Sequence, residues 1–590
     1  MKKISIYTTC VALAFGMASC GIDDVENYGE IAAGGFPVTE EDGEAAIAAV
    51  YQGLNDVMQD PQNSAFIYTA LLASDDMLGG GGDNDKLMQA LDLLCNYNAD
   101  MTNNLYVKKY KAINRANSLI ESLPNTAMSD EVKTRLLGEA KFMRAFNYYT
   151  LASMYGNVPV RTAPGGESIK QGDITDAWKL ILQDLYEAAS TMEAKRTAAS
   201  KAGHIDKYAA EAMLARAWLF YTGMFCNGTS LEQMTSESYD ADAITSVELP
   251  NGTNLTKQMV IDLIDDCVTN SGYDLVKDFR SLWAYTNRCT VEDYPYTAGQ
   301  GLKWAEDDNG ENIESMFAIK FNKFASWSTT IGYANGLALH LGVRGGQAYG
   351  NTFPFGQGWG AGPVAPNLVS DWKAAEPNDM RLDATIQDWR TSETYKYGGW
   401  SDFVQETDFY GKKFAPISAK NAEVDGGYSC TFENVMYPGN WDVSGKENMQ
   451  LNSIHDLVLI RFADVLLMQS ELKKDVSGIN RVRQRAGLTP IAGYSLKALQ
   501  DERRWELACE GLRWNDIRRW HIAASALDKQ LDQPTYYRGK PDTNKKHNGG
   551  YATRYKATAG FFKMPDTQIS MGAVEQNAGW TGSDSEYQGW

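Results

Sequence analysis

The chain has 590 residues, of which 44% are hydrophobic, 22% charged and 11% aromatic. This is the composition of a folded globular protein, and it argues against intrinsic disorder. Lys and Arg total 55 against 75 Asp and Glu, so the formal net charge is −20. An acidic chain repels phosphate backbones, so no nucleic-acid partner is expected.

The N-terminus predicts an exported lipoprotein. Two lysines precede an apolar run over residues 4–15, which is too short to span a bilayer but suits a secretory signal. The tetrapeptide MASC that ends at Cys20 resembles a bacterial lipobox. We therefore expect residues 1–19 to be removed and Cys20 to carry the lipid, with an ordinary signal peptide as the alternative. No later apolar run is long enough to cross a membrane, so a soluble body anchored by acyl chains is expected.

Helical patterns dominate as far as residue 226. Apolar residues recur at helical spacing over residues 44–58, 107–123, 136–155, 176–192 and 204–225. Successive helix–turn–helix pairs of this size resemble tetratricopeptide repeats, although no strict 34-residue consensus is visible. Such pairs leave one apolar face uncovered and must stack on their neighbours.

Residues 227–452 differ in character, because glycine, asparagine and proline become frequent and long helical periodicity fades. Loops with short strands and helices are expected there. Core packing is the usual role of large aromatic side chains, yet this region holds eight of the fifteen tryptophans: Trp283, Trp304, Trp327, Trp359, Trp372, Trp389, Trp400 and Trp441. Helices return over residues 456–472 and 479–488, and residues 523–590 look irregular.

The stretch DERRWELACEGLRWNDIRRW, residues 501–520, carries five acids and five arginines. Its charges cancel, so it is no basic footprint for nucleic acid. A helical arrangement would be apolar on two sides, with ion pairs Arg503–Glu506 and Glu510–Arg513 at i,i+3 spacing and a break near Gly511. We interpret this stretch as buried scaffold, not as an active site.

Seven motifs together resemble the SusD/RagB family of Bacteroidetes outer-membrane lipoproteins. They follow the lipobox in the family's order and span nearly the whole mature chain: YKAINRANSLIESL, GEAKFMRAFNYYTLASMYGNVPV, KYAAEAMLARAWLF, LIRFADVLLMQSEL, INRVRQRAGL, DERRWELACEGLRWNDIRRW and the tail with MPDTQIS and EQNAGW. The link ELKKDVSGI, residues 471–479, is shorter than usual, and Ser470 stands where the family usually has alanine.

The resemblance implies a mostly α-helical, SusD-like fold in which four tetratricopeptide-like helix pairs carry a loop-rich variable region. We expect one domain over residues 20–590. Residues 20–226 and 453–522 would form the scaffold, residues 227–452 the variable ligand-binding region, and residues 523–590 the tail. The family further implies a non-enzymatic cell-surface protein that binds an oligosaccharide or polysaccharide and acts as the hinged lid of a SusC-like TonB-dependent barrel in the outer membrane. A peptide-binding lid of the RagB kind is the alternative.

Motifs for catalysis and metal binding are missing from the sequence. The five histidines lie far apart without an HExxH pattern, and no GxSxG occurs. A glycoside-hydrolase pair of carboxylates could still hide among 75 acids, because sequence spacing does not fix their separation. No cofactor is expected, a structural ion stays open, and the scattered cysteines specify no disulfide.

Sugar binding calls for an aromatic face against the C–H surface of the ring and for polar groups that bind its hydroxyls. The run GGGGDNDK, residues 79–86, lacks the GK[ST] ending of a phosphate loop, but its carboxylates could accept hydroxyl hydrogen bonds. A turn with capping residues is the alternative for this segment. The candidate glycan-binding residues are Asp75, Asp76, Asp83, Trp283, Tyr285, Trp359, Arg381, Trp400 and Tyr410.

Overall fold

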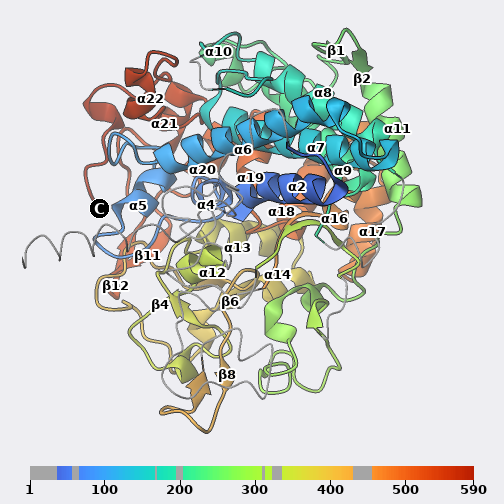
Figure 1. The fold of residues 1–590 in the computed structure, drawn as a ribbon. Helices are drawn as coiled ribbons and strands as arrows, with labels where there is room; N and C mark the ends of the chain where they lie inside the picture. The colour runs from blue at the N-terminus through green and yellow to red at the C-terminus, as the bar shows by residue number, and fades with distance from the viewer. Residues whose placement is uncertain are drawn as a thin grey trace, which may run out of the picture.

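A computed structural model describes residues 36–55, 66–165, 169–193, 203–307, 312–321, 335–429, 453 and 455–590. Figure 1 shows long helices in the upper half of the molecule and short strands with connecting loops in the lower half. The predicted signal sequence and Cys20 lie outside the described residues, as do Trp327, Trp441 and Cys430. Within the described ranges, no helix combines the length and apolar character needed to cross a bilayer.

The scaffold consists of four helix pairs, as the family resemblance implied. Each pair packs on the next, and the pairs are α2 (Glu40–Asn55) with α6 (Asn103–Ser122), α7 (Asp130–Tyr155) with α8 (Asp176–Thr191), α9 (Lys207–Met224) with α11 (Lys257–Asn270), and α16 (Phe462–Lys473) with α17 (Ser477–Arg485). Helix α11 falls in the region that the sequence assigned to variable loops, so the scaffold extends beyond residue 226.

Local sequence explains where the longest helix begins and ends. The side chain of Ser129 accepts a hydrogen bond from the Val132 amide, which caps the first turn of α7. Two acids in that turn, Asp130 and Glu131, complement the positive end of the helix dipole. The helix ends at Gly156, whose φ of 71° is unfavourable for residues with a side chain.

The prediction of a helix over residues 456–472 is partly wrong. The first residues of this segment form strand β10 (Leu457–Arg461), which pairs antiparallel with β3 (Ser315–Ile319), and α16 begins only at Phe462. A short continuous apolar run does not distinguish a buried strand from a buried helix, and here pairing with β3 decides for the strand.

The short link 471–479 is held in place by Ser470, the serine that stands where the family usually has alanine. The Ser470 hydroxyl accepts hydrogen bonds from the amides of Gly478 and Ile479 at 3.0 and 3.2 Å, at the start of α17. A Cβ atom on Gly478 would lie 1.9 Å from the Leu466 carbonyl oxygen, so the close approach of the two helices requires glycine there. Serine and glycine together make a tight hairpin out of a shortened sequence.

The variable region contains short elements, as expected. Its described elements include the helices α12 (Gly336–Leu341), α13 (Pro366–Ala375) and α14 (Met380–Thr385). They also include the two-stranded sheets of β4 (Val343–Arg344) with β5 (Gln357–Gly358), β6 (Ile386–Asp388) with β7 (Phe409–Gly411), and β8 (Ala419–Lys420) with β9 (Tyr428–Ser429). Aromatic residues of this region build a second hydrophobic core, separate from the scaffold core. Between the scaffold helices α9 and α11, the chain forms α10 (Leu231–Met234) and the hairpin of β1 (Ser246–Glu248) with β2 (Asn254–Thr256).

The tail is more regular than predicted. It contains α20 (Ala523–Asp528), α21 (Tyr551–Thr558), α22 (Asp566–Ser570) and the hairpin β11 (Pro534–Tyr537) with β12 (Lys540–Thr543). The elements are short and rich in polar residues, so periodicity did not reveal them. Near the N-terminus, α4 (Phe66–Leu72) and α5 (Lys86–Asp92) flank the glycine-rich run.

The dense stretch 501–520 is buried scaffold, as predicted, but its internal ion pairs were predicted wrongly. It splits into α18 (Leu496–Glu506) and α19 (Arg513–Arg519), because Cys509 and Gly511 adopt positive φ values of 62° and 78°. Glu510 and Arg513 therefore lie on opposite sides of the break. Arg503 shares α18 with Glu506 but pairs with Asp464 and Asp516. Glu506 instead contacts Arg461, 45 residues away, and Arg513 contacts Asp75.

Candidate functional site

Two of the predicted ligand residues, Asp75 and Asp76, are structural. Both side chains are buried, at 0% and 1% exposure. Arg513 donates two hydrogen bonds of 2.7 and 2.8 Å to Asp75, and Arg504 donates one of 2.8 Å to Asp76. Burial raises the pKa of Asp75, but the two arginines more than offset this and hold it at about 2. The prediction is wrong for these residues because the dense stretch occupies their carboxylates.

Arg381 is likewise unavailable to a ligand. Its guanidinium is fully buried and forms ion pairs with Asp379, Glu502 and Glu506 at 2.7, 2.7 and 2.9 Å. In the sequence NDMRLD, Arg381 could either bind a ligand or form an ion pair with a neighbouring acid, and the structure shows the ion pair with Asp379. Arg381 thus joins the variable region to α18.

Three predicted aromatic residues belong to the second hydrophobic core. Trp283, Tyr285 and Tyr410 are exposed by only 6%, 0% and 7%. The Tyr285 hydroxyl donates to the Ala384 carbonyl at 2.8 Å, and the Lys413 ammonium lies 4.8 Å from the Trp283 ring centre. Their faces pack against protein, so they offer a sugar no surface in this structure, and the prediction is wrong for them as well.

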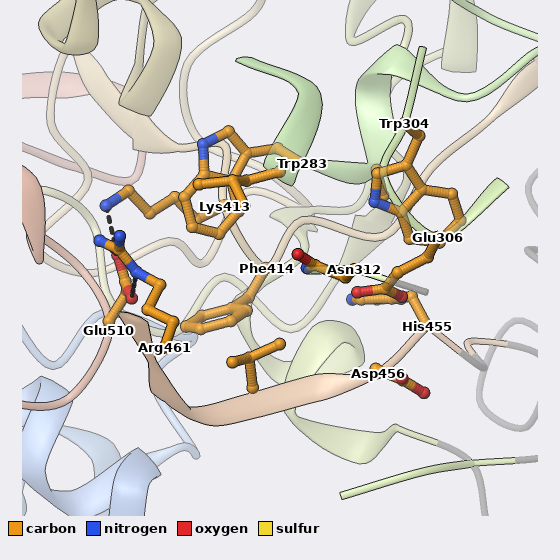
Figure 2. A pocket seen from close by; sticks show the side chains of 13 residues that line it. Trp283, Trp304, Glu306, Asn312, Lys413, Phe414, His455, Asp456, Arg461 and Glu510 are labelled. Carbon is orange, nitrogen blue, oxygen red and sulfur yellow. Dashed lines mark hydrogen bonds and ion pairs between the residues drawn. The ribbon is translucent and has the colours of Figure 1, made fainter. Parts of the chain in front are cut away.

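A small cavity lies beside Trp283 (Figure 2). Lys413, Arg461 and Glu510 line one end, and Glu306, Asn312 and His455 line the other, with Phe414 between. Burial, reinforced by Asp456, raises the pKa of Glu306 well above its usual range. The cavity offers about 30 Å³ to water-sized molecules, which is room for about two waters and not for a sugar ring.

The remaining three candidates, Asp83, Trp359 and Trp400, come together although they are far apart in the sequence. Trp400 is 46% exposed, one of the few large apolar side chains with so much free surface. The ring centres of Trp359 and Trp400 are 5.9 Å apart and inclined by 60°. Trp359 is partly buried and packs against the scaffold core, so Trp400 supplies most of the exposed aromatic surface of this pair, which we call the aromatic platform.

The glycine loop, residues 79–86, packs directly beside this platform. Gly80 and Gly81 have φ values of 69° and 72°, which allow the loop to turn back on itself. The Gly81 amide donates to the Gly360 carbonyl at 2.9 Å, one residue from Trp359. Asp85 accepts from the Gly82 amide at 2.6 Å, so the loop is both a capped turn and a carrier of partly exposed carboxylates.

Arg344, which the sequence analysis missed, connects the loop to the tryptophans. Its guanidinium donates to Asp85 at 2.8 Å, to Asp402 at 2.5 Å and to the Trp359 carbonyl at 2.7 Å. The guanidinium carbon lies 4.9 Å from the Trp400 ring centre, a cation–π contact. One arginine with so many fixed contacts sets the Trp400 ring relative to both carboxylates.

The hairpin of β11 and β12 completes the edge of the site. Arg538 pairs with Asp83, and the Tyr537 hydroxyl lies 3.4 Å from the same carboxylate. We use the name tryptophan face for the surface built from Asp83, Asp85, Arg344, Trp359, Trp400 and Asp402. Its three carboxylates keep 19–35% of their side-chain surface exposed, so each retains acceptor capacity beside the aromatic platform.

The residues that the structure describes contain no cluster of three or more His, Cys, Asp or Glu side chains with the geometry to bind a metal. Among the described cysteines, Cys95, Cys226, Cys267 and Cys509 are free thiols. Cys95, Cys267 and Cys509 are buried, as expected for small apolar side chains.

Comparison with known proteins places both halves of the chain in one family. Residues 345–580 match the model of the SusD family, and residues 25–243 match a model described as starch-binding associating with outer membrane. A SusD-like protein of Bacteroides ovatus is 23% identical over 501 residues, which cover 79% of this chain and 76% of that protein. SusD-like protein P38 of Formosa agariphila is 24% identical, with 89% of this chain and 93% of that protein covered.

Solved structures share the fold. A laminarin-binding SusD-like protein aligns with a TM-score of 0.65 at 22% identity, covering 92% of this chain and 100% of that one. Surface glycan-binding protein A from Bacteroides thetaiotaomicron in complex with laminarihexaose aligns with a TM-score of 0.65 at 19% identity, over 92% of this chain and 100% of that one. The four helix pairs, the variable region and these matches agree: the chain belongs to the SusD/RagB family.

Proposed function

We propose that this protein captures a glycan at the cell surface and that the tryptophan face is its binding site. The observation that carries the proposal is the meeting of Trp359, Trp400, Arg344 and three aspartates from four distant segments. A sugar ring can stack its C–H face on the exposed surface of Trp400 while its hydroxyls donate to the carboxylates. The fixed guanidinium of Arg344 keeps these groups in place, so little ordering is needed when the ligand binds.

The same geometry suits binding without cleavage. A glycosidase needs one carboxylic acid that donates a proton to the glycosidic oxygen and a second carboxylate beside it. The three carboxylates of the tryptophan face all accept hydrogen bonds from Arg344 or Arg538, an arrangement that holds acceptors and not a proton donor. The half-buried carboxyl groups of Glu306 and Asp456 lie at a cavity too small for a sugar.

The proposal extends to the way the protein works at the membrane. Family membership supports a role as the hinged lid of a SusC-like TonB-dependent barrel, with the lid attached to the outer membrane through lipid on Cys20. The lid would capture the glycan, close over the barrel and pass the ligand inward. Purification in mild detergent tests this part: a barrel protein should copurify with the lid, and repeated failure to find one would contradict it.

A ligand panel tests the binding function. Purified protein should be titrated with laminarin, other neutral and acidic polysaccharides, and a set of peptides. We expect binding to a polysaccharide, no binding to peptides, and no release of reducing ends during prolonged incubation. Binding to peptides alone would favour a RagB-like lid, and release of reducing ends would favour a hydrolase; either result overturns the proposal.

A further inference from the structure

We propose that Gln405 is a positioning residue of the tryptophan face, whose buried side chain fixes the glycine loop relative to the Trp400 turn, residues 398–403. The consequence is that Asp83 and Asp85 stay aligned with the Trp400 ring. This inference rests on the proposed function of the face, because the alignment matters only where a ligand touches both parts.

The contacts of Gln405 carry the proposal. Its side chain is fully buried, and its Oε1 atom accepts a hydrogen bond of 3.1 Å from the Gly80 amide. Its Nε2 atom donates to Asp92 at 2.7 Å and to Asn544 at 3.3 Å. A single amide group therefore joins the glycine loop, the end of α5 and the tail of the chain.

The residues around Gln405 repeat the same connections through the backbone. The Val404 amide donates to the Gly81 carbonyl, and the Arg538 amide donates to the Phe403 carbonyl, both at 2.8 Å. Next to Gln405, the Glu406 carboxylate accepts from the Gly398 amide at 2.6 Å, at the start of the Trp400 turn. Residues 403–406 thus bind the glycine loop, the Trp400 turn and the hairpin of β11 and β12.

Backbone strain in the residues that follow Trp400 shows how firmly this arrangement is held. Ser401 and Gln405 adopt φ values of 72° and 54°, which residues with a side chain rarely do. Such a conformation is unfavourable for a residue with a side chain and persists only where surrounding contacts determine it. At Gln405 those contacts are the hydrogen bonds described above.

The electrostatics of Asp92 give the proposal a distinctive test. Burial raises the pKa of Asp92 to about 7, and hydrogen bonds from Gln405, the Gly79 amide and Tyr551 oppose this rise. Tyr551, Cys95 and Tyr587 are titratable groups of the described residues that interact with Asp92 electrostatically. A carboxyl group at position 405 would face Asp92 directly, and two adjacent carboxyls share a proton at low pH but repel each other when both ionise.

The first experiment needs no ligand. Hydrogen–deuterium exchange should be compared between the wild type, Gln405→Ala and the matched control Gln530→Ala, which removes an equally buried glutamine that donates to the Ser74 carbonyl. We expect at least tenfold faster exchange over residues 79–85 and 398–403 in Gln405→Ala alone. Equal exchange in the two variants would overturn the inference.

The second experiment uses laminarihexaose as the probe. Gln405→Glu should bind it within about threefold of the wild type at pH 5.5 and at least tenfold more weakly at pH 8.5. Adding Asp92→Asn should restore affinity at pH 8.5, because the new asparagine amide can donate to the new carboxylate while Gly80 still donates to it. A double variant that binds no better than Gln405→Glu would overturn the inference, even if Gln405→Ala fails to fold.

The two proposals fail in different ways. If Trp400→Ala weakens binding but the Gln405 variants bind and exchange like the wild type, the face binds glycan and the positioning role is wrong. If neither the wild type nor any variant binds a glycan, the proposed function is wrong, while the exchange experiment still decides whether Gln405 holds the two loops together.

Discussion

Replacing Glu510 with alanine should destabilise the protein and leave glycan affinity unchanged. The Glu510 carboxylate is buried and accepts hydrogen bonds from Arg461 at 2.7 and 2.9 Å and from Lys413 at 2.6 Å. Burial raises the pKa of Glu510, but Arg461 and Lys413 outweigh burial, so the pKa lies below its usual value and the carboxylate is ionised. The substitution therefore leaves two buried cations with less compensation.

The expected loss of unfolding free energy depends on the partners that Arg461 and Lys413 keep in the variant. Removing one partner of a buried ion pair costs about 3–5 kcal/mol. Arg461 keeps Glu314 and Glu506, whereas Lys413 keeps the Glu506 carbonyl at 2.8 Å and its contact with the Trp283 ring. We therefore expect a loss near the lower end, about 3 kcal/mol.

Urea unfolding of Glu510→Ala measures this cost, with the exposed Glu575→Ala as a matched control. The control should remain within about 0.5 kcal/mol of the wild type. Laminarihexaose affinity, measured at a temperature where both variants are folded, should match the wild type within twofold. A variant that keeps its stability but loses affinity would refute our interpretation of the dense stretch as scaffold and would return it to the binding site.

Two further predictions concern pH and the membrane. Burial raises the pKa of Glu211 to about 8, with Lys207 lowering it only in part, so its contribution to stability is present below pH 4 and is lost as the pH rises through 8. Glu211→Gln should flatten this decline in urea midpoints measured from pH 5 to 9, and an unchanged slope would contradict the assignment. Cys20→Ala should release the protein from the membrane fraction, whereas continued retention there would rule out lipid on Cys20 as the anchor.

Much of the scaffold was predictable, because its helices carry regular apolar spacing and local start and stop signals. The segment that became α7 has both, with Ser129 at one end and Gly156 at the other. The apolar run Leu457–Arg461 has neither, and its strand conformation depends on β3, more than a hundred residues away. Sequence patterns specify local structure and leave distant pairing open.

The candidate site also combines features that the sequence indicates locally with contacts that only the fold determines. The sequence identified Asp83, Trp359 and Trp400 from their side-chain chemistry but could not rank Arg344 above Arg381. Arg344 has partners 58 and 259 residues away and lies beside an exposed tryptophan, whereas Arg381 is enclosed by acids from the dense stretch. Arg381 stands among acids in NDMRLD, whereas no acid lies between Glu314 and Asp371 around Arg344. Only the folded chain therefore distinguishes the guanidinium beside the exposed Trp400 from the one that is enclosed by acids.

Titration of Trp400→Ala tests the central claim most directly. The probe is the glycan that the wild type binds most tightly in the ligand panel, and the control is Met571→Ala, which removes an exposed apolar side chain elsewhere on the surface. Truncating a tryptophan that anchors a ligand costs about 2 kcal/mol or more, so we expect affinity to fall roughly 30-fold with unchanged thermal stability. If Trp400→Ala binds that glycan as tightly as the wild type and the control do, the tryptophan face is not the binding site.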